Sequence, residues 1–169
     1  MFRNDYILRV IELGTAALAR VLGLRQAKRH DEALAEIDLL LREDWGLNLD
    51  FVAQLDAASL LALVRGDQAN PALDIGKCVA LAGLLQAEGE IRGELGQPAE
   101  LEDRALKALA LLLEVAHYSD ASAGHALAPR IQTLSDLLAD AVFPAELNDR
   151  LSDYYDRGGP PADGAPLGL

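Results

Sequence analysis

The stretch from Pro98 to Tyr118 constrains the fold most, because its pattern is helical and apolar on nearly every side. Gly96 and Pro98 end the preceding segment and begin this one, and acidic residues follow in the first turn, where they complement the helix dipole. The apolar positions are Leu101, Ala105, Leu106, Leu109, Leu111, Leu112, Leu113, Val115 and Ala116. Such a helix belongs either in the middle of a bundle or at an oligomer interface.

The segment from Pro71 to Leu95 predicts a second long helix, capped by Asn70 and paired with the first. Small residues recur on one of its faces at a spacing of three or four, at Ala72, Gly76, Ala80, Gly83 and Ala87. A glycine inside a helix is less stable than alanine by about 0.5 to 1 kcal/mol. We therefore interpret Gly76, Gly83, Gly89 and Gly93 as places where another helix approaches closely, with a kink between Gly89 and Gly93 as the alternative.

The rest of the chain is also helical in pattern, since alanine and leucine dominate and aromatic residues are only 5%. Helices are expected over residues 5–25, 31–44, 51–55, 56–64 and 124–141, and after Pro144. We expect a turn at 120–124, with Pro129 within the first turn or so of the helix that follows. The prediction is an all-α domain over residues 1–157, an antiparallel bundle of about six to seven helices. Residues 158–169, rich in proline and glycine, are expected to be a disordered tail.

Charge and composition narrow the choice of partner. The net charge of −12 repels nucleic acid and anionic membranes, so neither is expected to bind, and a basic protein partner is favoured. The single cysteine, Cys78, suits a reducing compartment and an inert buried thiol. Asp5 and Glu12 interrupt any signal-peptide core, and no apolar run is long enough for a membrane span, so we expect a cytoplasmic protein.

The first 30 residues are the exception to this acidity, with six basic and two acidic side chains. Arg25, Lys28 and Arg29 are candidate partner-binding residues at the end of the first helix. The alternative is a solvated helix end whose basic residues match the helix dipole. Nucleic-acid or membrane-surface contact through these residues and Arg20 is a further hypothesis, which the global charge opposes.

Glu114 and His117 form a Glu-x-x-His pattern on one helix, as in di-iron and di-manganese bundles. A complete metal site would need a homodimer axis to duplicate this pattern, with Glu88, Glu90 or Glu94 as further ligands. The alternative is a histidine at a helix end. The chain has no P-loop, nucleophile elbow, zinc-protease motif or cysteine pair, so we assign no catalytic residue and no cofactor.

Tyr154 and Tyr155, flanked by charged residues near the end of the predicted domain, are further candidates for partner binding. Packing of a ring onto the bundle is the alternative, because aromatic residues at helical spacing usually reach the core.

Two segments resemble tetratricopeptide (TPR) repeats, which are helix pairs stacked into a solenoid. In the first, residues 22–41, Asp31-Glu-Ala-Leu34 matches the start of the repeat's second helix. In the second, residues 87–109, Gly89 resembles the small residue of the repeat's first helix and Leu95-Gly96 the pair that ends it. Asp5-Tyr-Ile-Leu-Arg9 and the second segment also resemble a family of uncharacterised bacterial helical proteins. The resemblance implies a short TPR-like α-solenoid.

We therefore predict a non-catalytic intracellular scaffold or adaptor that binds protein partners, with homodimerisation favoured. The alternative function is a metal-binding helical bundle that uses Glu114 and His117, with oxidoreductase activity as the chemistry that such a site could support.

Overall fold

The computed structural model describes residues 18–65, 71–119 and 121–158, and their side chains except those of 71–74 and 121–123. Every regular element in these ranges is a helix, which confirms the all-α prediction. Residues 18–26 are helical and precede α2 (His30–Trp45), α3 (Leu49–Gln54), α4 (Ala57–Arg65), α5 (Pro71–Glu94), α6 (Pro98–Tyr118), α7 (Ala121–Leu137) and α8 (Ala145–Asp156). The part of the predicted first helix before residue 18 and the predicted tail from 159 to 169 lie outside the described residues.

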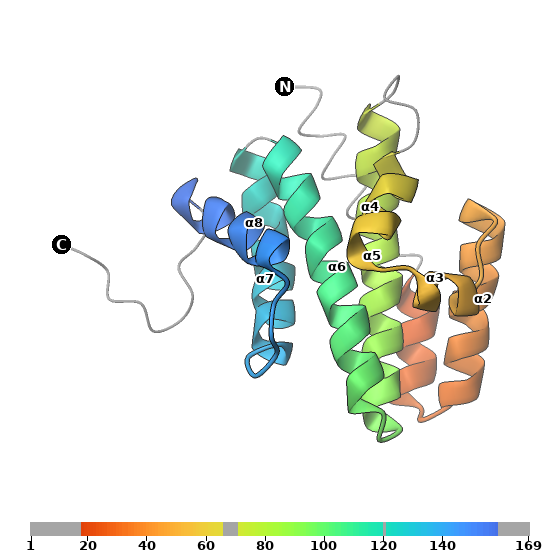
Figure 1. The fold of residues 1–169 in the computed structure, drawn as a ribbon. Helices are drawn as coiled ribbons and strands as arrows, with labels where there is room; N and C mark the ends of the chain where they lie inside the picture. The colour runs from red at the N-terminus through yellow and green to blue at the C-terminus, as the bar shows by residue number, and fades with distance from the viewer. Residues whose placement is uncertain (1–17, 66–70, 120, 159–169) are drawn as a thin grey trace.

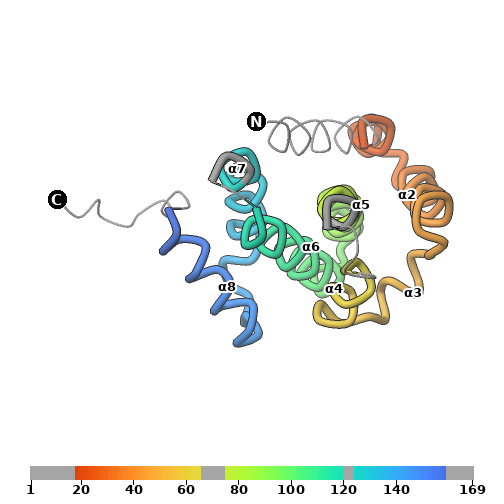
Figure 2. Tube along the Cα trace, turned by 90° about the horizontal axis from the view of Figure 1, so that it is seen from above, coloured from red at the N-terminus to blue at the C-terminus, as the bar shows by residue number. Residues whose placement is uncertain are grey.

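The helices lie side by side around a central antiparallel pair, α5 and α6 (Figure 1). Viewed from above, α2 and the helix over 18–26 lie on one side of α5, and α7 and α8 lie beyond α6 (Figure 2). The short helix α4 contacts both members of the central pair, and α8 packs against α6. Consequently α6 has neighbours on several sides.

The glycines of α5 lie where its neighbours come close. A β-carbon on Gly89 would lie 2.9 Å from Cβ of Arg104 and 3.3 Å from the Leu101 carbonyl oxygen, both in α6. A β-carbon on Gly93 would lie 2.9 Å from Cδ2 of Leu101. On another side of α5, Gly83 faces Leu18 and Arg130. The interpretation of these three glycines as close-approach sites is confirmed.

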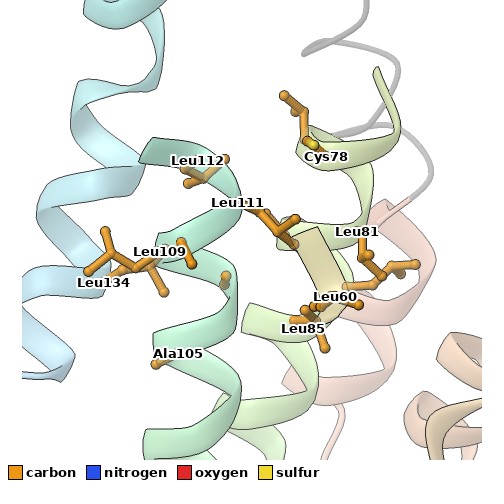
Figure 3. Packing of buried hydrophobic residues seen from close by; sticks show 14 of the residues in the cluster. Leu60, Cys78, Leu81, Leu85, Ala105, Leu109, Leu111, Leu112 and Leu134 are labelled. Carbon is orange, nitrogen blue, oxygen red and sulfur yellow. The ribbon is translucent and has the colours of Figure 1, made fainter. Parts of the chain in front are cut away.

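Nearly the whole circumference of α6 is buried within this one chain. Buried residues run without interruption from Lys107 to Val115. Leu109 lies beside Leu134 of α7, while Leu60 of α4 reaches Leu85 of α5 on the other side of the central pair (Figure 3). Of the two places predicted for an all-round apolar helix, α6 therefore occupies the middle of the bundle.

Local signals fix the first helix boundaries as the sequence predicts. Gly46 ends α2 in the left-handed conformation, with a φ of 65°. The Asn48 side chain accepts a 2.8 Å hydrogen bond from the Phe51 amide and caps α3. Asp56 accepts a 2.7 Å bond from the Ser59 amide at the start of α4.

The boundaries predicted for α7 were wrong at both ends. The helix begins at Ala121, inside the predicted turn, so Pro129 lies in its interior rather than near its first turn. Alanine favours helix on both sides of Ser122, which outweighs the turn signal of serine and glycine. The helix ends at Leu137 instead of Ala141, because Ala139 and Ala141 bond to carbonyls only three residues back.

The close approach of α5 and α6 leads to a first prediction. Gly89→Ala places a methyl group against the backbone and Cβ atoms of α6, so the free energy of unfolding should fall by about 1 to 3 kcal/mol. Gly23→Ala is the matched control. It is also in a helix, but its added β-carbon meets no atom within 4 Å, so stability should rise by about 0.5 to 1 kcal/mol. Urea unfolding measures both, and equal effects would contradict the close approach.

Candidate functional site

The basic residues singled out in the sequence gather where the helix over 18–26 turns into α2. We call Arg25, Lys28, Arg29 and His30 the basic junction. Lys28 adopts a φ of 60°, in the left-handed region that lysine seldom occupies. Its amide bonds to the Arg25 carbonyl at 2.9 Å, so the chain reverses within a few residues. The turn thus holds the four side chains together beside α5.

Two glutamates one turn apart on α5 face the basic junction. Arg25 pairs with Glu90, and its Nε donates to Glu94 Oε1 at 2.8 Å. The other Glu94 oxygen lies 2.7 Å from His30 Nε2 and 3.7 Å from Lys28 Nζ. The hydrogen bond with His30, followed by that with Arg25, lowers the pKa of Glu94, against the opposing effect of burial. These contacts tie the first two helices to the C-terminal end of α5.

The side chains of the three predicted partner-binding residues of the junction differ in their exposure to solvent. The Arg25 side chain is 26% exposed and is engaged with α5, whereas Lys28 is 72% and Arg29 56% exposed. Arg29 pairs with Glu32 on the next turn of α2. An open depression is lined here by Leu22, Arg25, Gln26, Lys28 and Glu94. The surface available to a partner therefore combines exposed cations with one apolar side chain.

The residues of the Glu-x-x-His pattern face different neighbours. The buried Glu114 carboxylate accepts a 2.8 Å hydrogen bond from Arg65 Nε and lies 3.6 Å from Arg150. His117 Nδ1 lies 3.0 Å from Asp153 on α8.

The three glutamates considered as further metal ligands are also paired, Glu88 with Arg92 and Arg104 and the other two with Arg25. Within the described ranges, no three His, Cys, Asp or Glu side chains are placed to hold a metal ion.

The two tyrosines of α8 lie against the bundle. Tyr154 is buried, and its hydroxyl donates to the Gly124 carbonyl at 3.4 Å. Burial raises the pKa of Tyr154. Tyr155 is partly buried and packs on the core, with its ring centroid 5.4 Å from that of Tyr154. Tyr154 therefore takes the packing role given above as the alternative to partner binding.

The sequence analysis considered Glu88 only as a possible metal ligand and missed the buried polar cluster that joins it to α6, with a contact to the end of α3. Glu88, only 1% exposed, accepts a 3.0 Å bond from Arg104 Nε. Lys107, 2% exposed, donates to Asp103 at 2.8 Å and to the Ala53 carbonyl at the end of α3 at 3.0 Å. A usable signal existed, because Arg104 and Lys107 are charges set into an otherwise apolar helical pattern.

Comparisons of the chain with family models, curated proteins and solved structures give no match. The TPR resemblance thus stays a prediction. Across the described part of the chain, no helix is long and apolar enough to cross a membrane.

The contacts of Glu94 predict a pH-dependent contribution to stability. Because folding lowers the pKa of this carboxyl, its contribution is present above the pKa of the unfolded chain and is lost as the pH falls through the folded value. At pH 7, Glu94→Gln should therefore lower the free energy of unfolding by about 1 kcal/mol. The difference from wild type should shrink as the pH is lowered from about 5 to 3.

Urea titrations at a series of pH values measure this difference. Glu43→Gln is the control, because Glu43 is exposed on α2 and has no ion pair in the described structure. A deficit of Glu94→Gln that stays constant down to pH 3 would show that the carboxylate charge is not what stabilises the junction.

Variants of Glu114 and His117 distinguish a structural ion pair from a metal site. If the pair with Arg65 is its role, Glu114→Gln should destabilise the fold by about 1 to 3 kcal/mol, and a chelator should change nothing. His117→Ala should cost less, because the His117 side chain is 30% exposed. Thermal melts with and without EDTA, with elemental analysis of untagged protein, test this. Bound metal that disappears in both variants would establish the metal site instead.

Proposed function

We propose that this chain is a non-catalytic protein-interaction module and that the basic junction is its contact surface. The observation that carries the proposal is the open depression beside the junction, where Lys28 projects next to the half-exposed Leu22. Protein interfaces place polar and charged side chains at the rim of a less polar centre, and arginine is enriched among binding hot spots. Arg29, on the same turn, extends the cationic surface.

The proposal includes self-association into a homodimer in the cytoplasm. A second copy offers acidic surface to the basic junction, because the chain has 27 acidic and 15 basic residues in all. The apolar faces of α6 do not serve this contact, since they are buried inside one chain. Dimerisation would therefore use the surface around the depression, and other protein partners would compete for the same side chains.

The basic junction also decides which partner chemistry is expected. The acidic remainder of the surface favours a basic partner, whereas Lys28 and Arg29 favour carboxylates. A partner with both acidic and basic patches could pair with the basic junction and with the acidic surface at once, and a second copy of this chain has both.

Charge reversal at the exposed part of the junction tests the proposal. The double variant Lys28→Glu, Arg29→Glu should retain its fold, because both side chains are more than half exposed. Its self-association, measured by light scattering and sedimentation, should weaken about tenfold or more, with a smaller loss for wild type at high salt. Affinity capture from the native lysate should lose the same proteins that wild type retains.

Arg42→Glu is the matched control, because this exposed α2 arginine carries the same charge away from the depression. It should leave association and capture unchanged. Identical association and capture by the double variant and wild type would remove the basic junction from the proposal.

A further inference from the structure

Arg130 of α7 extends towards α5 at a point where that helix has no side chain. Its Nη2 atom lies 3.1 Å from the position that a β-carbon on Gly83 would occupy. The side chain of Leu18 approaches the same position from the helix over 18–26. Three helices therefore meet around this guanidinium, and the glycine gives it room against α5.

Arg130 differs from the other arginines of the described ranges in having no carboxylate. Each of the others lies within 4.0 Å of an aspartate or glutamate oxygen: Arg20, Arg25, Arg29, Arg42, Arg65, Arg92, Arg104, Arg150 and Arg157. No ion pair or side-chain hydrogen bond joins Arg130 to any residue that the structure describes. The chain has 27 acidic residues, so an arginine without a nearby carboxylate stands out among the described ones.

Partial burial makes this cation costly to leave without a partner. Loss of water lowers the pKa of the Arg130 guanidinium, and none of the described residues places a carboxylate where it would oppose that effect. Arginine nevertheless keeps its proton in proteins, so the side chain remains a cation with donors arranged as a planar fork. That fork matches two oxygens of a carboxylate or a phosphate group.

We propose that Arg130, lying against Gly83 between α5 and α7, is an anion-binding site for a ligand that carries a carboxylate or phosphate group. The site is independent of the basic junction, since it shares no residue with it. A ligand oxyanion supplies the charge that the other arginines receive from within the chain. Without ligand, Arg130→Gln should be as stable as wild type or more so, because it removes a partly buried cation that has no carboxylate partner in the described ranges.

Thermal unfolding with sodium phosphate or sodium acetate at constant ionic strength tests the site. Either salt at 50 mM should raise the Tm of wild type by about 2 to 4 °C. The rise should be absent in Arg130→Gln and unchanged in Arg42→Gln, the control that loses an exposed, already paired arginine. A response to phosphate, to acetate or to both supports the site, and the stronger response identifies the ligand group.

A second measurement does not depend on the stability of the variant. In wild-type protein labelled with ¹⁵N, the Nε–Hε resonance of Arg130, assigned by its loss in Arg130→Lys, should shift on titration with the anion. The same Tm rise in Arg130→Gln, or no Tm rise and no shift of this resonance in wild type, would overturn the proposal.

Discussion

The fold depends on the close packing of α5 against α6. Gly89 and Gly93 let Leu101 and the stem of Arg104 lie against the α5 backbone, which brings the two helix axes together. The other faces of α6 then pack against α4, α7 and α8. A helix with apolar residues on nearly every side must be covered on nearly every side, and here the cover comes from the same chain, so these glycines and the leucines of α6 are parts of one arrangement.

The buried charges of the bundle are held in pairs between helices. Burying a carboxylate is costly without a partner, and the two most buried ones of the described residues, Glu88 and Glu114, both pair with arginines of other helices. The basic start of the chain serves the fold as well, since Arg25 binds two glutamates of α5. Arg25 is therefore largely engaged within the fold, whereas Lys28 and Arg29 are the residues of the basic junction that stay exposed to a partner.

Local patterns predicted the helices well because their signals are local. Gly46, Asn48 and Pro98 each act on the backbone within a few residues, and the periodicity of α6 marks its burial directly. The start of α7 was missed where short-range signals disagreed with each other. The candidate site was only half predictable, because Arg25 stood out by its charge but its partner Glu94 lies 69 residues further along the chain.

The spacing of Glu114 and His117 shows the limit of such motifs. Three residues on a helix place two side chains on one side, yet Glu114 is buried between Arg65 and Arg150 while His117 reaches Asp153 at the rim. A metal ion at Glu114 would have to displace a guanidinium that already satisfies the carboxylate. Arg130 presents the opposite case, a cation that has no carboxylate partner among the described residues. A ligand is therefore expected at Arg130, where it would supply a negative charge, rather than at Glu114, which already has arginine partners.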